Sequence, residues 1–495
     1  MRSSSAKQRY DMNTKIIGRY LGVLLMLEAV FLIPPTLISL FNSELNALYG
    51  LIITIVLTFS IGFLLSRLCR KYVHTLYTKD GMVLVACSWI VLSLFGALPF
   101  TISGEIPSFV DSFFEVVSGF TTTGASILTD VESMSRGLLF WRSFTHWLGG
   151  MGILVFLMAL EPSRKSSSFT LHVMRAESPG PSVSKLVPRI GQTAKILYAI
   201  YIMMTVLCVV FLLIGGMPLF DSLCTAFGTA GTGGFGIKND SIAGYSPYLQ
   251  TVITIFMALF GVNFAVYHLF LHRPKEAFKD EEVRLYFSIM LISTGIITIN
   301  ILPQVGNLWE SLHEAAFHVS SIMTTTGFAI SDFNLWPTLS HGILLLLMVL
   351  GACAGSTGGG IKTARLLLMY KSMRAGIRRM LHPRSVQVIT LNGKPVEASV
   401  LHGLNVYFAA YAFISVLSFL IISIDNFSVT TNFSAVLACF NNIGPGLDLV
   451  GPAENYSLFS VPSKLVLTLD MLLGRLEIFP LLALLNPEIY RVRNK

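Results

Sequence analysis

The sequence predicts an all-α polytopic membrane protein, and its composition and a repeated sequence pattern both point to this fold class. The 495 residues are 53% hydrophobic and only 13% charged, with a mean hydropathy of +0.68. Such a composition excludes an ordinary soluble globular protein. Short runs of glycine and small polar residues also interrupt the apolar sequence at long, similar intervals.

The apolar runs define the expected membrane crossings. A helix needs roughly 20 apolar residues to cross a bilayer core of about 30 Å. About ten runs approach or exceed that length; they lie near residues 16–40, 45–66, 82–101, 138–160, 191–214, 248–271, 284–302, 338–369, 400–424 and 464–485. The run from Ile16 is too long for a signal peptide and has no small-residue cleavage site, so we expect it to remain as the first membrane helix.

The net charge of +8 reflects membrane topology rather than nucleic-acid binding. Most of the 35 Lys and Arg residues lie in loops on one side of the crossings, at the N-terminus and near 67–79, 164–195, 273–284, 362–394 and 491–495. The positive-inside rule places these segments and both termini in the cytoplasm. The opposite loops are acidic, which would attract cations, although these acids are equally explained as solvated loop charges.

Four glycine runs in the outer loops form an internal repeat. They are Phe120–Ser126, Gly231–Gly236, Thr324–Ala329 and Asn441–Gly446. Taking Gly124, Gly234, Gly327 and Gly444 as equivalent gives a period of roughly 90 to 120 residues, far longer than a solenoid unit.

A short, moderately apolar segment precedes each glycine run. It opens at Asp111, Asp221 and Glu310, and more weakly at Thr430. About ten residues cannot span a bilayer, so we expect re-entrant half-helices with acidic residues at their N-terminal ends. Their carbonyl ends would point at the membrane centre, where the partial negative charge favours a cation.

The repeat gives a domain organisation of two leading helices followed by four helix, half-helix, glycine-loop and helix units. The expected boundaries are 1–79 for the N-terminal tail and leading helices, then 80–165, 166–280, 281–397 and 398–495 for the four units around a central pore. Backbone carbonyls aimed inward can replace a cation's hydration shell, and glycine allows the backbone conformations that such loops need. A set of simple turns is the alternative.

The stretch Ala352–Lys362 is glycine-rich and polar, yet it interrupts the apolar run that starts near Ile343. Irregular backbone at membrane depth is tolerated only where it is buried in protein or lines a water-filled path. The stretch also approximates a phosphate-binding loop, but Ile361 stands where that motif requires lysine. Arg475 lies inside the last apolar run, where an ionisable group usually faces a pore or a partner, and Glu477 offers an ion pair as the alternative.

Other polar residues in the apolar runs are expected to have structural roles. We expect Arg142 and Lys464 to be interface or packing residues, Glu28 to make a helix contact, and His146 and His318 to be packing histidines. The six cysteines are scattered singly, without the paired spacing of a zinc site or a disulfide framework.

These motifs together resemble the Trk/Ktr/HKT superfamily of potassium transporters, and the two leading helices resemble its bacterial TrkH branch. The resemblance covers about Ile16 to Tyr490. It implies potassium as the transported ion and a filter of backbone carbonyls from Thr122, Thr123, Gly124, Thr232, Gly233, Gly234, Thr325, Thr326, Gly327, Asn442, Ile443 and Gly444. In this superfamily, serine at the first glycine position goes with sodium transport, so Gly124 favours potassium. The fourth loop, with Asn442 and Ile443, departs from the TTTG form.

The resemblance also implies a gate and partners. The gate would comprise Gly355, Ser356, Thr357, Gly358, Gly359, Gly360 and Arg475. A basic cytoplasmic helix with Arg374, Arg378, Arg379 and Arg384 would bind a cytosolic nucleotide-binding regulatory subunit (TrkA-like), with binding to anionic lipid headgroups as the alternative. Residues 386–396 read as a hairpin with an Asn-Gly turn.

The expected protein is therefore a non-enzymatic, homodimeric potassium-uptake subunit of the bacterial inner membrane, without an organic cofactor or a nucleic-acid partner. Sodium- or proton-coupled uptake is the alternative. A membrane-embedded enzyme is a remote one, because no cluster of catalytic residue types lies in the apolar runs.

Overall fold

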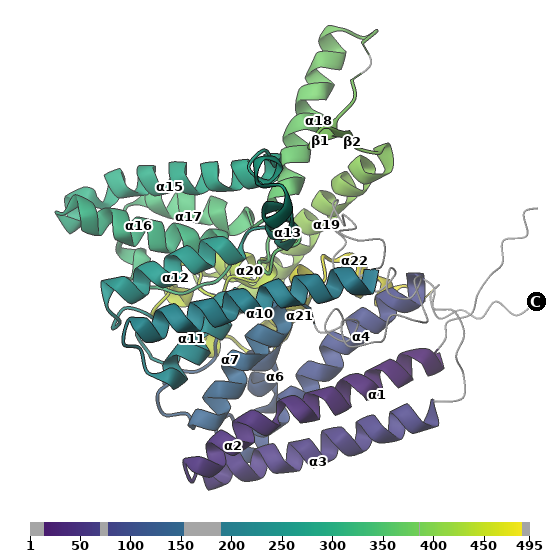
Figure 1. Ribbon diagram of the computed structural model, residues 1–495, viewed down its shortest axis with the longest axis vertical. Helices are drawn as coiled ribbons and strands as arrows, with labels where there is room; N and C mark the ends of the chain where they lie inside the picture. The colour runs from purple at the N-terminus through teal and green to yellow at the C-terminus, as the bar shows by residue number, and fades with distance from the viewer. Residues whose placement is uncertain (1–13, 70–77, 153–189, 386, 488–495) are drawn as a thin grey trace, which may run out of the picture.

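The computed structural model describes residues 14–69, 78–152, 190–385 and 387–487, and these are mostly helical (Figure 1). The predicted all-α membrane fold is confirmed. Within the described residues, six helical segments are long and apolar enough to cross a membrane: Thr14–Phe41, Leu45–Leu68, Lys79–Ser103, Thr193–Ile214, Glu281–Val305 and Ala398–Asp425.

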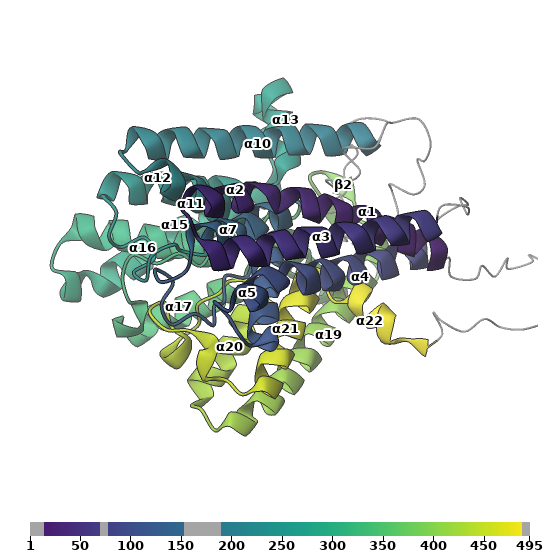
Figure 2. The same cartoon turned by 90° about the horizontal axis from the view of Figure 1, so that it is seen from below.

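The leading helices are α1 (Thr14–Phe31), α2 (Ile33–Phe41) and α3 (Leu45–Leu68). Helix α2 continues α1, and α3 runs back antiparallel to both, along the lower edge of the molecule in Figure 1 and in front of the other helices in Figure 2. Glycines bring α1 and α3 together: a Cβ on Gly22 would lie 2.6 Å from the carbonyl oxygen of Gly62. Small residues of this kind allow close backbone approach between membrane helices.

The described residues after α3 form four similar units. The first contains α4 (Thr78–Gly96), α5 (Leu98–Ser103), α6 (Phe109–Phe120) and α7 (Arg136–Gly150), and the second contains α10 (Ile190–Ile214), α11 (Leu219–Gly231), α12 (Pro247–Phe260), α13 (Phe264–His272) and α14 (Pro274–Ala277). The third contains α15 (Glu281–Val305), α16 (Leu308–Met323), η1 (Phe333–Leu335), α17 (Thr338–Val349) and α18 (Thr363–Leu381). The fourth contains α19 (Ala398–Ile422), η2 (Ser423–Asp425), α20 (Val429–Phe440), η3 (Asp448–Val450), η4 (Tyr456–Leu458), α21 (Val461–Arg475) and α22 (Phe479–Leu485).

The predicted short half-helices are present as α6, α11, α16 and α20. Asp111, Asp221 and Glu310 lie in the first turns of the first three, as expected. The fourth begins one or two residues earlier than predicted, because Ser428 caps α20 by accepting a hydrogen bond from the Thr431 N–H at 3.0 Å.

The helix that follows the glycine loop is broken in the second, third and fourth units, where the sequence indicated a break only in the third. Helices α12 and α13 meet at an angle of 89°, α17 ends at Val349 before α18 begins at Thr363, and α21 ends at Arg475 before α22 begins at Phe479. In the first unit, α7 ends at Gly150, close to the end of the described segment. The predicted runs 248–271, 338–369 and 464–485 are thus two-part elements rather than single straight helices. The predicted run 138–160 extends past the described residues.

Helix α18 and the hairpin after it extend away from the body of the molecule (Figure 1). Strands β1 (Thr390–Leu391) and β2 (Lys394–Pro395) pair antiparallel, with Thr390 opposite Pro395. Asn392 and Gly393 both have positive φ, +50° and +74°, as a two-residue hairpin turn requires. The predicted Asn-Gly hairpin is therefore confirmed, although residue 386 lies outside the described residues.

Candidate functional site

The four glycine loops share one backbone conformation. Each has positive φ at two alternate residues: Thr122 and Gly124, Thr232 and Gly234, Thr325 and Gly327, and Asn442 and Gly444. The first of each pair is a non-glycine residue at φ between +55° and +60°, a conformation that β-branched threonine seldom adopts. The shared pattern places Gly124, Gly234, Gly327 and Gly444 at equivalent positions, as the sequence predicted.

The same hydrogen bond closes each loop onto its half-helix. In each loop, the residue just before the positive-φ glycine donates its N–H to the carbonyl five residues earlier in the chain. The pairs are Thr123 to Ser118 at 2.8 Å, Gly233 to Gly228 at 2.9 Å, Thr326 to Ser321 at 2.8 Å, and Ile443 to Ala438 at 2.9 Å. The fourth loop has this geometry despite its different residues. Its Asn-Ile sequence therefore changes the side chains and leaves the backbone conformation intact.

The four loops form a closed ring. A Cβ on Gly124 would lie 1.9 Å from the carbonyl oxygen of Gly233, one on Gly234 1.9 Å from that of Thr326, and one on Gly327 2.0 Å from that of Ile443. A Cβ on Gly444 would lie 2.8 Å from the carbonyl oxygen of Thr123, which returns to the first loop. Any side chain at these four positions would displace a neighbouring loop, so glycine is required by the packing as well as by φ.

A cavity of about 160 Å³ lies against the ring of loops. Gly124, Gly234, Gly327 and Gly444 all line it. The cavity is an open vestibule, with Glu454 and Lys238 also at its wall.

Hydroxyl and amide groups support the loops from behind. Thr121 and Thr123 share a hydrogen bond of 2.8 Å between their Oγ1 atoms, and the equivalent pair Thr324 and Thr326 share one of 2.7 Å. Asn442 Nδ2 donates to Thr123 Oγ1 at 3.0 Å and joins the fourth loop to the first. The asparagine that departs from the TTTG form thus makes a bond across the ring.

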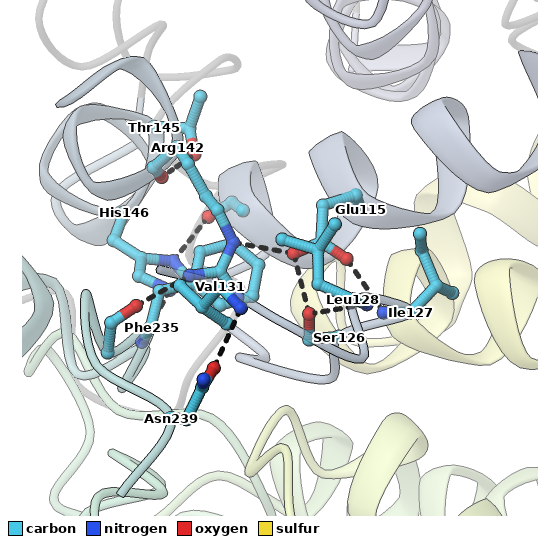
Figure 3. Close-up of polar contacts among 12 residues, drawn as sticks. Glu115, Ser126, Ile127, Leu128, Val131, Arg142, Thr145, His146, Phe235 and Asn239 are labelled. Carbon is cyan, nitrogen blue, oxygen red and sulfur yellow. Dashed lines mark hydrogen bonds and ion pairs between the residues drawn. The ribbon is translucent and has the colours of Figure 1, made fainter. Parts of the chain in front are cut away.

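A buried ion pair supports the first two loops (Figure 3). Arg142 Nε of α7 donates to Glu115 Oε1 of α6 at 2.6 Å, and Arg142 Nη1 donates to the Gly236 carbonyl at 2.8 Å. Glu115 also accepts bonds from Ser126 Oγ and the Ile127 N–H, both at 2.9 Å. Of the two roles predicted for Arg142, the interface position is wrong because its side chain is buried. Its contacts to Glu115 and Gly236 give it a packing role between the first two loops.

His146 contacts the same two loops (Figure 3). Its Nδ1 lies 2.7 Å from the Gly119 carbonyl oxygen, and its Nε2 accepts the Phe235 N–H at 3.2 Å. Nδ1 therefore carries the hydrogen, and the neutral ring bridges α6 to the second loop. The predicted packing role is correct, but the packing is against the ring of loops.

The glycine-rich stretch 352–362 is non-helical and lies against the ring, as predicted for the irregular segment. The Gly359 N–H donates to Thr325 Oγ1 at 2.6 Å, and Thr357 Oγ1 donates to the Phe260 carbonyl at 3.3 Å. A Cβ on Gly359 would lie 2.5 Å from the Asn441 carbonyl oxygen. The other predicted gate residues of this stretch, Gly355, Ser356, Gly358 and Gly360, lie in the same segment. Ser356 Oγ donates to the Cys353 carbonyl at 2.7 Å and so closes a turn. We call residues 352–362 the intramembrane loop.

Arg475 lies between the ring, the intramembrane loop and the C-terminal end of α7. Its Nη1 donates to Thr122 Oγ1 at 3.1 Å and to the Thr357 carbonyl at 2.7 Å. Its Nη2 donates to the carbonyls of Gly149 and Gly150, both at 2.6 Å. These carbonyls belong to the last residues of α7, where the helix no longer supplies every carbonyl with an intrahelical donor. Glu477, the alternative partner, forms an ion pair with Arg365.

One basic residue, Lys464, and one acidic residue, Asp448, have partners that the sequence did not reveal. Lys464 of α21, expected at an interface, pairs with Asp111 at the start of α6 at 2.7 Å. Asp448 accepts hydrogen bonds from Ser428 Oγ at 2.5 Å and Thr431 Oγ1 at 2.7 Å, at the start of α20. These hydroxyl donors lower the pKa of the Asp448 carboxyl. The fourth half-helix thus receives from η3 the negative charge that its own first turn lacks.

The basic residues predicted for docking lie together on the projecting segment. Arg374, Arg378 and Arg379 are exposed on α18, and Arg384 is exposed just after it. Glu28, expected to make a helix contact, is buried between α1 and the end of α4, with its carboxylate near Gly96.

Comparison with known proteins agrees with this geometry. The family model TrkH, described as a cation transport protein, matches residues 49–488. The chain is 36% identical to the Trk system potassium uptake protein TrkH of Salmonella typhimurium, covering 97% of this chain and 100% of that protein. It is 32% identical to the Trk system potassium uptake protein TrkG of Escherichia coli, over 97% of this chain and 100% of that protein.

A solved structure has the same fold. The crystal structure of the potassium transporter TrkH from Vibrio parahaemolyticus superposes with a TM-score of 0.87 at 31% identity, covering 97% of this chain and 100% of that chain. The family match over most of the chain and the full-length relatives together show that this multi-pass membrane protein belongs to the TrkH family of cation transport proteins.

Proposed function

We propose that this protein takes up potassium ions across the bacterial inner membrane, through a filter formed by the ring of four loops. The observation that carries the proposal is the closed ring itself: four loops of one conformation, each glycine packed on the next loop's carbonyl. The relatives are named as potassium uptake proteins, and the transported ion is the expected ligand of such a ring.

The loop conformation suits ion coordination. Residues of positive and negative φ alternate along Thr122, Thr123 and Gly124 and their counterparts, so successive peptide groups turn the same way and can present a row of carbonyl oxygens. Such oxygens replace the hydration shell of a potassium ion. The half-helices add their partially negative carbonyl ends, which favour a cation at the ring.

The intramembrane loop and Arg475 would form the gate. The loop is bound directly to the third filter loop through Gly359 and Thr325, and the guanidinium of Arg475 bonds to both the loop and Thr122. A fixed positive charge beside the ring opposes the passage of a cation. Movement of the loop would break its bond to Arg475 and free the guanidinium to move away from the ring.

The exposed arginines on the projecting α18 support a docking role for this segment. A cytosolic nucleotide-binding regulatory subunit would bind the projecting α18 at Arg374, Arg378, Arg379 and Arg384, and two copies of the chain would form the transporter. Both termini would face the cytoplasm, as the distribution of Lys and Arg predicts.

The proposal is tested by ion flux. The purified chain is reconstituted into proteoliposomes, and uptake of ⁸⁶Rb⁺ is measured in competition with potassium and with sodium, under imposed sodium and proton gradients. We expect uptake that potassium inhibits and sodium does not. Absence of rubidium and potassium flux, with and without the cytosolic subunit, would overturn the proposal, and flux that requires a sodium or proton gradient would favour coupled uptake.

Arg475 provides a test of the gate. We expect Arg475→Ala to raise basal flux several-fold, because it removes both the charge and the bonds that hold the intramembrane loop to the filter. Arg475→Lys keeps the charge but cannot reach four acceptors with its single ammonium group, so its flux should lie between those of the alanine variant and the wild type. Flux unchanged in both variants would exclude Arg475 from the gate.

A further inference from the structure

Three consecutive acidic residues at the start of α15 each contact a different part of the third unit. Asp280, Glu281 and Glu282 contact the hairpin turn, helix α18 and the intramembrane loop, respectively. No sequence motif singled them out, and each contact joins residues at least 72 positions apart.

Glu282 holds both ends of the intramembrane loop with one oxygen. Its Oε1 accepts the Ala354 N–H at 2.6 Å and the Ala364 N–H at 3.0 Å. The Glu282 side chain is buried, so these charge-assisted bonds are formed away from water, where they are strong. If the carboxylate is lost, two buried backbone donors lose their acceptor.

The two ends of the intramembrane loop are paired with each other, and we call this pairing the neck of the loop. Gly351 donates to the Ile361 carbonyl at 2.9 Å and Ile361 donates to the Val349 carbonyl at 3.2 Å, so the chain enters and leaves the loop side by side. Glu282 bonds to residues just inside and just outside this neck. Its carboxylate therefore fixes the loop relative to α15.

Glu281 and Asp280 connect the same turn of α15 to the projecting segment. Lys371 of α18 forms an ion pair with Glu281, and its Nζ also donates to the Thr390 carbonyl of the hairpin at 2.8 Å. Asn392, at the tip of the hairpin, donates from Nδ2 to Asp280 Oδ2 at 2.7 Å and accepts the Glu281 N–H at 2.9 Å. Asp280 Oδ1 meanwhile caps α15.

We propose that Glu282 is a positioning residue that holds the intramembrane loop closed, and that Asp280 and Glu281 transmit displacements of the hairpin and α18 to it. The functional part of this inference rests on the proposed gating of the pore by that loop. The structural part, that Glu282 fixes the loop, stands on the contacts alone. A partner that pulls on the hairpin would then act first on the N-terminal turn of α15, one residue from Glu282.

Hydrogen exchange measured by mass spectrometry tests the structural part on the full-length protein. In Glu282→Ala, we expect amides of peptides covering 352–364 to exchange about tenfold faster or more, because two charge-assisted bonds are lost. Glu282→Gln keeps a carbonyl acceptor of the same shape, so its exchange should lie between those of the alanine variant and the wild type. Glu276→Gln is the matched control, since Glu276 is an exposed acid of the preceding helix α14 that forms a surface ion pair with Arg273.

The link to the hairpin is tested by Asn392→Gly, which keeps a residue that tolerates φ of +50° while removing both amide contacts. We expect faster exchange at the start of α15 and, to a smaller extent, at 352–364. Because Asn392 is exposed, this variant should fold even if Glu282→Ala does not. Unchanged exchange at 352–364 in a folded Glu282 variant would overturn the proposal. If neither Glu282→Ala nor Glu282→Gln folds, unchanged exchange at 352–364 in Asn392→Gly would overturn it.

Flux of ⁸⁶Rb⁺ tests the functional part. We expect Glu282→Ala and Glu282→Gln to raise basal flux without changing the preference for rubidium over sodium. A change in ion preference without faster loop exchange would mean that Glu282 supports the filter instead. If the wild type passes no rubidium, the proposed function fails while the exchange data still decide whether Glu282 fixes the loop.

Discussion

Each of the four ring glycines is required twice, once by its positive φ and once by the neighbouring carbonyl. Gly124 has φ of +79°, and a Cβ there would lie 1.9 Å from the Gly233 oxygen. No side chain fits at that distance without moving the second loop. The spacing of ring oxygens is thus set by backbone contact between loops, and the smallest side chain should alter it.

Gly124→Ser is the residue-level prediction for selectivity. We expect the preference for potassium over sodium to fall by about tenfold, a change of about 1.4 kcal/mol, because the displaced carbonyl alters the cavity that replaces the hydration shell. Competition between ⁸⁶Rb⁺ and sodium in proteoliposomes measures it. Gly104→Ser is the control, since that glycine also has positive φ but no atom within 4 Å of its Cβ position. Retained preference in Gly124→Ser would contradict the assignment of the filter.

The pair of Glu115 and Arg142 gives a second residue-level prediction. Removing one partner of a buried ion pair costs about 3–5 kcal/mol, since the other charge stays buried and unpaired. We expect Glu115→Ala to lower the melting temperature strongly and to weaken potassium preference, because the Arg142 contact to Gly236 and the Glu115 contact to Ile127 hold loops one and two.

Thermal unfolding in detergent measures the melting temperatures of the wild type, of Glu115→Ala and of the double variant Glu115→Gln/Arg142→Gln. The double variant leaves no isolated buried charge, so it should be more stable than Glu115→Ala. Equal stability of both variants and the wild type would show that the pair contributes nothing.

The residues of the ring could be predicted from the sequence, whereas their supports could not. The glycines recur at similar intervals, and an internal repeat is visible without a structure. Glu115 and Arg142 are 27 residues apart, and Asp111 and Lys464 are 353 apart. Nothing in one sequence says that such distant charges meet, so the sequence predicts only an interface or packing role for Arg142 and Lys464.

At the scale of elements, the half-helices and the broken helices meet at the ring. The third break was predicted because a stretch of eleven residues rich in glycine and polar side chains interrupts the apolar run at 352–362. The second was not, because Gly261 and Asn263 are the only unusual residues between two apolar helices. A hydropathy average passes over so short an interruption, although the chain turns by 89° there.

Asp448 carries the prediction for the fourth half-helix. Its carboxylate lies at the start of α20 and stabilises the positive end of that helix. We expect Asp448→Asn to lower the melting temperature at pH 7 by a few degrees, since the amide keeps hydrogen bonding but removes the charge. Glu454→Asn, an exposed acid of the same outer segment, should have little effect.

The sign of the pH dependence follows from the lowered pKa of Asp448. Its stabilising contribution is fully present above the pKa of an unfolded aspartate, about 3.9, and is lost as the pH falls through the lower value of the folded state. The difference in melting temperature between wild type and Asp448→Asn should therefore shrink in acid below that range. A difference that grows on acidification would contradict the assignment.

At the scale of the whole molecule, the projecting α18 is continuous with the intramembrane loop, since the helix begins at Thr363, directly after it. The exposed arginines on this helix have two candidate binding partners, an acidic protein surface or anionic lipid headgroups. Their position on a segment that extends away from the body (Figure 1) favours the protein, because headgroups lie next to the membrane-embedded helices.

The last prediction separates these partners. Replacing Arg374, Arg378, Arg379 and Arg384 with glutamine should weaken binding of the cytosolic regulatory subunit by at least about tenfold and reduce the salt dependence of that binding. Binding of detergent-solubilised protein to the subunit is measured by surface plasmon resonance at several salt concentrations. The matched control replaces Arg273, Lys275, Lys279 and Arg284, which removes the same charge from the neighbouring basic segment. If both variants bind the subunit equally well, while only the first loses affinity for anionic lipid nanodiscs, the arginines contact headgroups and the docking assignment is wrong.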